Sequence, residues 1–481
     1  MFGSFELSPR QQKTLGIVVI PTAGHITPVI GLANEAKGDD PNLIVVIVLT
    51  SWDGYKMQPK DQQALLKACD RLVILESKTI TNRRDIFGRA SELLPSVINA
   101  LRGCDYILYD FMAPEGYIAA KHLGLAPFCI EPSFVGKLDD HSKEYQEEMK
   151  SCQRHLVEVR DKYGVDLTGR LRLTDGVVSV VAEKYILLSY KNLIYAGEFS
   201  QNPDEIKKQS YFMRPTRLKE PALGSALSFV KTTDKKIIYF SLGTIASGPV
   251  WDILDKNSFR DFVRFIYRSL IQLAEKRNDF ILIISSGRNP EDILGKDYTL
   301  PDNVHIFESL PQRELLCYAS VFFTHAGNNS LNEGIDAEVG MVFLPLMFDQ
   351  HQAAAAAARL DLGVAFLHSP EESKGEESVV KFTSDQYYRT PFRPGKIDEA
   401  MRTFEKTIDH ILKKNYAANF VAVKNGMRYT FKDLGRLLEE KVVVENKKQP
   451  IQTGPFFSRG FSRSCSDPIG LNPKNYRPGL K

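Results

Sequence analysis

The chain is poor in the features that mark several common protein classes. Among 481 residues it has six cysteines and two tryptophans, and its formal net charge is only +3. The cysteines form no CxxC pair and no cluster with zinc spacing, so we expect reduced thiols rather than a disulfide scaffold. A near-neutral charge without a long basic run argues against nucleic-acid binding led by electrostatics.

Long apolar runs are equally scarce. The main stretch without formal charge, Gly16–Ala33, contains Pro21, Gly24, His25 and Pro28. These residues suit a strand, a turn and a helix better than a membrane span. The first residues, MFGSFELSPRQQK, have no apolar core and predict no signal peptide. We therefore expect a cytoplasmic protein without a membrane span.

What the chain does have is a regular alternation of short β-branched runs with segments of helical period. This pattern predicts a doubly wound parallel sheet with right-handed crossovers. It breaks at a polar, proline-bearing stretch and then resumes, so we expect two α/β domains that enclose a ligand site. The predicted buried strands are Leu15–Pro21, Leu43–Thr50, Arg71–Leu75, Asp105–Asp110, Ala126–Ile130, Tyr185–Ser189, Ile237–Leu242, Phe280–Ser285, Val304–Phe307, Val321–Thr324, Val342–Leu344 and Gly363–Phe366.

These patterns divide the chain into five predicted segments. Residues 1–213 form an N-terminal Rossmann-like domain, 214–236 a linker, and 237–414 a C-terminal Rossmann-like domain. Residues 415–441 form a C-terminal helix that packs back on the N-terminal domain. Residues 442–481 are rich in Pro, Gly, Ser and Arg and are expected to be a disordered tail.

The strongest chemical signal is the segment VFFTHAGNNSLNEGIDAEVGMVFLPLMFDQ. An apolar strand runs into His325, and Asn329 and Ser330 are N-cap residue types that open a helix. A helix N-terminus offers unpaired N–H groups and the positive end of a dipole, so it suits a diphosphate. Glu333 lies one turn further on, where a carboxylate can accept from ribose hydroxyls. A plain β–α–β unit with a capped helix is the simpler alternative.

This segment and its flanks resemble the nucleotide-sugar signature of the UDP-glycosyltransferase family, and the resemblance covers most of the chain up to about residue 440. The matching positions are Leu310-Pro311-Gln312, Thr324-His325, Gly327, Asn329-Ser330, Glu333, Pro345 and Asp349-Gln350. The resemblance implies the GT-B fold, in which two Rossmann-like domains face each other. It also implies an inverting transfer from a UDP-sugar, without a metal or cofactor, to an acceptor held by the N-terminal domain.

The resemblance further implies a role for each matching residue on the donor side. The implied diphosphate contacts are Thr244, His325 and Ser330, with Gly327 and Asn329 beside them; Glu333 holds the ribose, Gln312 and Ser286 lie near the uridine, and Asp349 and Gln350 bind the hexose.

A second signal, Pro21–Pro28, places His25 just after the first strand. Sugar transfer to a hydroxyl requires a base, and the imidazole pKa lies near neutrality. Asp110 ends the strand Asp105–Asp110 and is the candidate that orients His25, whereas Asp105 lies at the opposite edge. The family resemblance agrees with both assignments. A turn role for His25 and an N-cap role for Asp110 are the alternatives.

Three positions depart from the family pattern. Ser309 stands where an indole usually stacks on uracil, and such a loss costs ~1–3 kcal/mol. Glu338-Val339-Gly340 replaces the usual Gly-Val-Pro turn, and Ala353 replaces the asparagine that follows Asp-Gln. These departures leave weak donor binding, or a donor other than UDP-glucose, as an alternative.

We therefore predict an inverting UDP-dependent hexosyltransferase that acts on a hydroxyl of a small, largely apolar acceptor. UDP-glucose ranks before UDP-glucuronate, because no Lys or Arg adjoins Asp349-Gln350 to select a carboxylate. One alternative is a degenerate GT-B scaffold that binds a ligand or partner without catalysis. A nicotinamide dehydrogenase is a weaker alternative, because Pro21–Pro28 has one glycine where GxGxxG is needed.

Overall fold

The structure is a computed structural model of the chain. Residues 1–440 group into one compact unit, and all the described residues fall within it. The structure describes residues 12–55, 57–80, 85–138, 142–174, 177–213, 223–243, 257–296, 298–346, 349–367, 397–425 and 432–439.

The N-terminal half is built around a seven-stranded sheet in which every strand pair is parallel. The strand order is β3-β2-β1-β4-β5-β8-β9, so the winding reverses between β1 and β4, as in other doubly wound folds. The strands are β1 (Thr14–Val19), β2 (Ile44–Ser51), β3 (Arg71–Glu76), β4 (Tyr106–Asp110), β5 (Pro127–Glu131), β8 (Tyr185–Leu187) and β9 (Ser210–Phe212).

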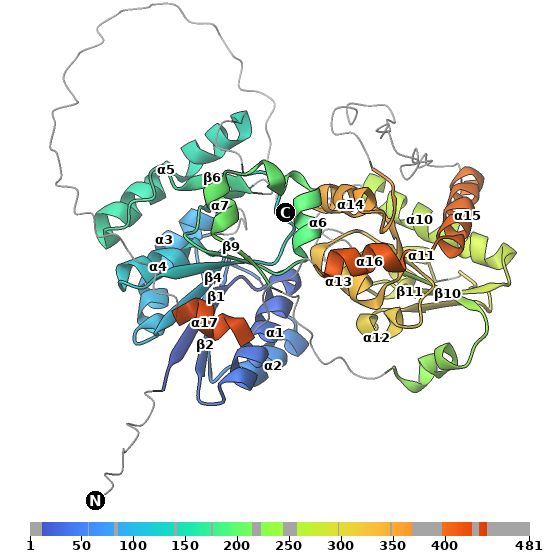
Figure 1. Cartoon of the computed structure of the whole chain (residues 1–481), viewed down its shortest axis with the longest axis horizontal. Coiled ribbons are helices and arrows are strands. Elements are labelled where there is room, and N and C mark those ends of the chain that lie inside the picture. Colours follow the sequence, from blue (N-terminus) through green and yellow to red (C-terminus); the bar gives the residue numbers. More distant parts are fainter. Residues whose placement is uncertain are drawn as a thin grey trace, which may run out of the picture. The chain divides into compact units, whose positions relative to one another are not determined.

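Helices cover both faces of this sheet (Figure 1). Successive residues of a strand point to opposite faces, so Ile17 joins a core with α1 and α2 while Val18 joins a core with α3, α4 and α5. Apolar residues on both faces explain why the strands read as continuous β-branched runs. The helices are α1 (Ala23–Asp39), α2 (Pro59–Ala68), α3 (Ile86–Leu101), α4 (Pro114–His122), α5 (Lys143–Tyr163), α6 (Lys191–Ala196) and α7 (Asp204–Lys208).

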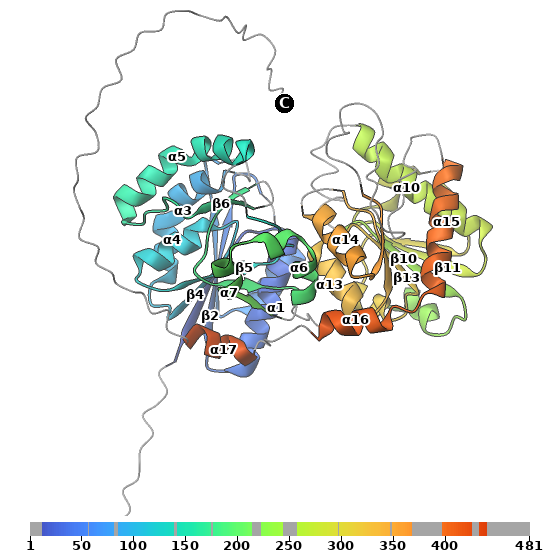
Figure 2. The same cartoon turned by 45° about the horizontal axis from the view of Figure 1, so that its top comes forward.

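The C-terminal half repeats this plan with a six-stranded parallel sheet of order β12-β11-β10-β13-β14-β15 (Figure 2). Its strands are β10 (Lys236–Ser241), β11 (Phe280–Ser285), β12 (Val304–Phe307), β13 (Val321–Thr324), β14 (Gly340–Phe343) and β15 (Gly363–Ala365). Its helices are α10 (Asn257–Lys276), α11 (Pro290–Leu294), α12 (Gln312–Leu316), α13 (Asn328–Ala337), α14 (Gln350–Arg359), α15 (Ile397–Lys413) and α16 (Ala417–Lys424). The two sheets confirm the predicted α/β class with two Rossmann-like halves.

Each predicted strand is present, with its ends shifted by at most two residues. The sequence did not predict β9 or the antiparallel hairpin of β6 (Leu171–Thr174) and β7 (Val177–Val180). The predicted linker is wrong in part, because a 3-10 helix spans Ser225–Lys231 and β10 begins at Lys236; residues 214–222 lie outside the described residues. The predicted tail, 442–481, also lies outside them.

The single helix predicted for residues 415–441 is wrong, because the described residues there form two helices. The first, α16, ends at Lys424, and the backbone N–H of the C-cap residue Asn425 donates to the carbonyls of Val421 and Val423. The second, α17 (Lys432–Glu439), contacts α1, and Leu438 is buried in the core beneath α1. None of the helices in the described ranges is long and apolar enough to cross a membrane.

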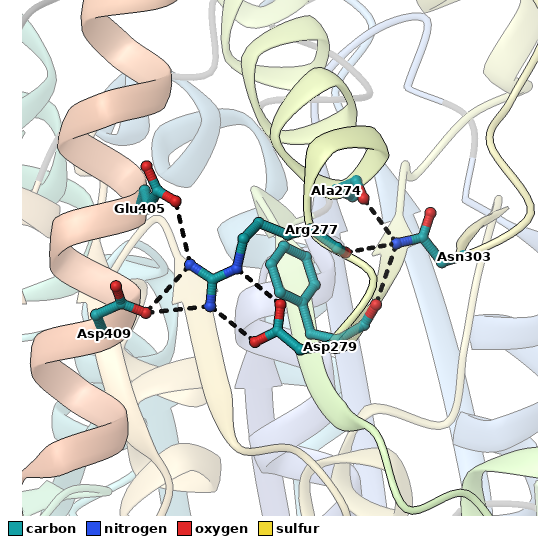
Figure 3. A network of polar contacts seen from close by, with 7 residues as sticks. Ala274, Arg277, Asp279, Asn303, Glu405 and Asp409 are labelled. Atoms are coloured by element: carbon teal, nitrogen blue, oxygen red, sulfur yellow. Dashed lines mark hydrogen bonds and ion pairs between the residues drawn. The ribbon is translucent and has the colours of Figure 1, made fainter.

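A dense polar cluster ties together the C-terminal half away from its ligand-facing strand ends (Figure 3). Arg277 donates to both carboxylate oxygens of Asp279 at 2.7 Å and to Glu405 and Asp409 at 3.2 Å. The amide of Asn303 donates to the carbonyls of Ala274, Arg277 and Phe280 at 2.7, 3.0 and 3.1 Å. These contacts join α10, β11, β12 and α15.

Candidate functional site

His25 and Asp110 meet at the carboxyl edge of the N-terminal sheet. His25 lies in the first turn of α1, directly after β1, and Asp110 ends the neighbouring parallel strand β4. His25 Nδ1 lies 2.5 Å from Asp110 Oδ2. Asp110 is fully buried, and its Oδ1 accepts from the backbone N–H of Met112 at 2.8 Å. The carboxylate is therefore held from both sides and fixes the imidazole with its proton on Nδ1.

The imidazole of His25 has one nitrogen left for chemistry. Its ring stacks on Phe111 with a centroid distance of 5.7 Å and an interplanar angle of 27°. Because Nδ1 is engaged by Asp110, Nε2 is the nitrogen that a ligand can reach, and His25 lines a cavity of about 430 Å³. Stacking and the carboxylate together set the ring plane, so this nitrogen has a defined direction.

The cavity is lined by residues of both halves. Its N-terminal wall includes apolar side chains from Ile20, Trp52, Phe111, Met112 and Val177. Of the donor residues implied by the family resemblance, the cavity is lined by Gln312, His325, Gly327, Asn329, Ser330, Glu333, Asp349 and Gln350. The structure thus brings these predicted residues together with His25.

The N-terminal turn of α13 carries a connected group of polar side chains. Gln312 Nε2 donates to Glu333 at 2.6 Å and to the Ser330 hydroxyl at 3.2 Å. Tyr239 donates to Gln312 Oε1 at 2.9 Å and so orients this amide. The sequence did not single out Tyr239, because an aromatic residue within a buried strand is normally a core residue. Gln312 and Glu333 therefore act as one unit on the wall of the cavity.

His325 is held without charge beside this turn. Burial lowers the pKa of His325 to about 4, so the imidazole is neutral near pH 7. The ring packs tightly on two glycines, because a Cβ at Gly243 or Gly327 would come within 2.4 or 2.3 Å of it. The next residue, Ala326, has a left-handed φ of 63°, an uncommon conformation for alanine that is often found at functional sites. His325 can therefore donate a hydrogen bond to a phosphate but cannot neutralise it.

Asp349 reaches across to the N-terminal half. Its Oδ2 accepts from the backbone N–H of Phe134 at 2.7 Å. Burial raises the pKa of Asp349 above its usual range, although the Phe134 hydrogen bond and the nearby His25 oppose this rise. Gln350 is buried, and its Oε1 accepts from the backbone N–H of Leu346 at 2.9 Å. Both side chains are thus ordered by the protein before any sugar binds.

One predicted donor contact, Ser286, does not line the cavity, and another cannot be placed. Thr244 lies outside the described residues. Ser286 is fully buried, and its hydroxyl donates to the carbonyls of Arg288 at 2.5 Å and Phe307 at 3.0 Å. Its neighbours Ser285 and Gly287 line the cavity instead. The Ser286 hydroxyl therefore closes the turn after β11 instead of lining the cavity, which counts against the predicted contact of Ser286 with the uridine.

Sequence reasoning missed Asn328, which lines the cavity, and Asn332, which is hydrogen-bonded to it. Asn328 lines the cavity, and its amide donates to the carbonyls of Pro132 at 2.8 Å and Leu188 at 3.2 Å in the N-terminal half. The only available signal was their spacing of four on the helix expected after His325, which places them on one face. Within the described residues, no group of three or more His, Cys, Asp or Glu side chains could hold a metal ion.

Comparisons with known proteins agree with this geometry. Residues 217–382 match the family described as UDP-glucoronosyl and UDP-glucosyl transferase. The chain is 23% identical over 417 residues to an uncharacterized UDP-glucosyltransferase, YdhE, of Bacillus subtilis, covering 82% of this chain and 95% of that one. It is 24% identical over 324 residues to human UDP-glucuronosyltransferase 2B17, covering 63% and 55%.

Solved structures share the whole architecture. The kitacinnamycin glycosyltransferase superposes with a TM-score of 0.60 at 18% identity, over 89% of this chain and 98% of that one. UGT71G1 of Medicago truncatula, solved with UDP-glucose, gives a TM-score of 0.56 at 13% identity, over 89% and 98%. At these identities the structures establish the GT-B fold. The family match over residues 217–382 and the curated relatives support a UDP-glycosyltransferase, that is, a transferase that uses a UDP-sugar.

Proposed function

We propose that the protein transfers glucose from UDP-glucose, with inversion at the anomeric carbon, to a hydroxyl of a small, largely apolar acceptor. The observation that carries this proposal is the His25–Asp110 pair, joined at 2.5 Å, on the wall of the cavity that Glu333 and Asp349 also line. A base oriented by a buried carboxylate is the group that hydroxyl attack requires.

In the proposed reaction, the acceptor hydroxyl donates its proton to His25 Nε2. The acceptor oxygen forms a bond to C1 of the sugar as the bond from C1 to the diphosphate oxygen breaks, and UDP leaves from the opposite face. Asp110 stabilises the imidazolium that forms. This single displacement inverts the configuration at C1.

The departing diphosphate needs compensation for its developing charge. The N–H groups at the start of α13 and a hydrogen bond from neutral His325 are the proposed source. Fixed donors in a partly dry cavity need no reorganisation during the reaction, which is why they lower the barrier. The proposal includes no metal, and a chelator such as EDTA is therefore expected to leave the transfer rate unchanged.

The two walls of the cavity support the assignment of substrates. Trp52, Phe111 and Met112 give the acceptor side an apolar surface, which favours a small apolar acceptor. On the donor side, the carboxylates of Glu333 and Asp349 favour hydroxyl-rich groups and disfavour a glucuronate carboxylate. UDP-glucuronate is the second candidate donor, because the human relative is a glucuronosyltransferase by name.

The test is a thermal-shift panel of UDP, UDP-glucose, UDP-glucuronate, TDP and NAD, followed by an acceptor screen with the stabilising donor. The proposal predicts stabilisation by UDP and UDP-glucose and the formation of a glycoside. Ser309 replaces a stacking indole, so we expect the UDP shift to be modest. No response to any nucleotide would favour a degenerate scaffold, and a response to NAD alone would favour a dehydrogenase.

A further inference from the structure

The donor helix α13 is hydrogen-bonded directly to the backbone of the N-terminal half. Asn332 Nδ2 donates to the carbonyl of Leu188 at 3.2 Å and to Asn328 Oδ1 at 3.2 Å, and the Ser189 hydroxyl donates to Asn332 Oδ1 at 3.2 Å. Asn328 adds its bonds to Pro132 and Leu188. We call these five residues the asparagine seam: Pro132, Leu188, Ser189, Asn328 and Asn332.

The seam is buried and fully satisfied. Asn328 is 4% exposed, and Asn332 and Ser189 are each 1% exposed. Its carbonyl acceptors follow β5 and β8, at the carboxyl edge of the sheet that also carries Asp110. Carbonyls at strand ends have no ladder partner, so a buried amide is what satisfies them here. Loss of one amide leaves buried polar groups without partners on both sides.

At the N-terminal end of α13, the hydrogen bonds of the seam extend towards His25. The residue after Asn328, Asn329, donates from Nδ2 to the carbonyl of Gly24 at 3.3 Å, one residue before His25. One turn beyond Asn332, Asp336 accepts from Tyr190 and from Arg313. On one face of α13, Ser330 and Glu333 line the proposed donor site. On the adjacent face, asparagine side chains hydrogen-bond to the backbone of the N-terminal half, including the carbonyl next to His25.

We propose that Asn328 and Asn332 are positioning residues, which set the distance between His25 and the sugar donor and thereby favour the acceptor over water. This inference rests on the proposed function. Directional hydrogen bonds hold α13 in one register, whereas apolar contacts alone permit sliding, and misplacement of about 1 Å at a reacting centre costs up to ~100-fold in rate. Asn192, which joins α6 to α16 through the carbonyl of Ala422 at 2.8 Å, is an exposed contact away from the cavity.

Hydrolysis of the sugar donor is the reaction that competes with transfer to the acceptor. In hydrolysis, a water oxygen forms the bond to C1, the bond from C1 to the diphosphate oxygen breaks, and one water proton is released. The products are free sugar and UDP, where transfer gives glycoside and UDP. The ratio of glycoside formed to UDP released measures the fraction of donor that reacts with the acceptor and not with water. This ratio does not depend on the fraction of folded protein.

The experiment compares this ratio in the wild type, Asn332→Leu, Ser189→Ala and the control Asn192→Ala, at saturating UDP-glucose with the best acceptor from the screen. Asn332→Leu keeps the side-chain volume and removes the amide. We expect its ratio to fall about five- to tenfold because the acceptor step needs the tighter geometry. Ser189→Ala removes one hydrogen bond from the seam and is expected to lower the ratio about twofold. Asn192→Ala is expected to match the wild type.

A lower melting temperature and lower total activity at an unchanged ratio would show that the seam only stabilises the fold, and would overturn the proposal. So would an equal fall of the ratio in Asn192→Ala. If Asn332→Leu does not fold, Ser189→Ala decides the question by the same ratio. A wild type that releases no UDP from any donor would instead overturn the proposed function itself.

Discussion

The Arg277–Asn303 cluster and the wall of the cavity differ in how completely their buried polar atoms are hydrogen-bonded. The Arg277 guanidinium is matched by three carboxylates, and the Asn303 amide by three carbonyls (Figure 3). Around the cavity, by contrast, the buried Nδ1 of His325 has no hydrogen-bond partner of good geometry among the described residues, although the Ser241 backbone interacts with the ring. Thr22 Oγ1, on the N-terminal wall of the cavity, is also buried without a hydrogen-bond partner among the described residues.

This difference distinguishes polar groups that stabilise the fold from polar groups that can bind a ligand. A buried polar atom without a partner costs free energy, so such an atom on the wall of the cavity is open to a hydrogen bond with a ligand. The cluster of Arg277 and Asn303 is fully paired and lies away from the cavity, so we expect it to contribute to stability alone. Substitutions of polar residues on the wall of the cavity should therefore change catalysis, and substitutions in the Arg277–Asn303 cluster should change only stability.

His25→Ala should give the largest effect. Removal of the base is expected to lower the transfer rate about 10³-fold, because general base catalysis contributes 10²–10⁴-fold. The thermal shift produced by UDP should stay at its wild-type value, which serves as the control for folding. A variant that keeps its full rate would contradict the assigned role.

Asp110→Asn should reduce the rate by about 10²-fold. The amide fills the same buried space, but it can no longer hold the proton on Nδ1 or stabilise the imidazolium. Glycoside formation with time, at saturating donor and acceptor, measures this loss. An Asn variant as active as the wild type would mean that Asp110 serves only as an acceptor for the Met112 N–H.

Glu333→Ala should act on donor affinity more than on turnover. The loss of hydrogen bonds to a charged group costs about 1.5–3 kcal/mol, so KM for UDP-glucose is expected to rise at least about tenfold. The partner Gln312 also loses its acceptor at 2.6 Å. Initial rates over a range of donor concentrations separate KM from kcat, and an unchanged KM would remove Glu333 from the donor site.

Asn303→Ala should give the opposite result. Its amide satisfies three carbonyls in a buried position, so its loss is expected to destabilise the fold by about 1–3 kcal/mol. The midpoint of urea unfolding measures this change. At a temperature where the variant is folded, kcat should equal the wild-type value. A large fall in kcat would show that the Asn303 cluster also affects catalysis and would contradict the comparison.

The smallest expected effect is on the stability of the fold at acid pH. The Arg277 hydrogen bond lowers the pKa of Asp279, so this pair stabilises the fold above the unfolded pKa of the carboxyl and loses that contribution as pH falls through the folded one. Asp279 is 54% exposed, so solvent screening keeps the contribution below about 1 kcal/mol. Asp279→Asn should therefore flatten the acid side of the stability profile slightly, and a steeper profile would contradict this sign.

Much of the fold could be predicted because its signal is local. Buried parallel strands such as β1 and β2 read as continuous β-branched runs, and His25 and Asp110 each follow such a run. Parallel pairing then brings both residues to one edge without further information. The short strand β9 (Ser-Tyr-Phe) escaped because it follows a polar segment and contains no β-branched residue.

The remaining site residues depend on contacts that a sequence does not display. A hydroxyl such as that of Ser286 can face the cavity or a carbonyl, and only the positions of Arg288 and Phe307 decide this. Asn328 and Asn332 on a helix look like an exposed polar face until the N-terminal half covers them. Distant partners, rather than local propensity, determine these roles.

The most direct test of the account is the anomeric configuration of the product, read by proton NMR from the coupling constant of the anomeric proton. With UDP-α-glucose as donor, direct displacement by an acceptor activated by His25 predicts a β-glucoside. An α-glucoside would contradict the single displacement on which the account rests.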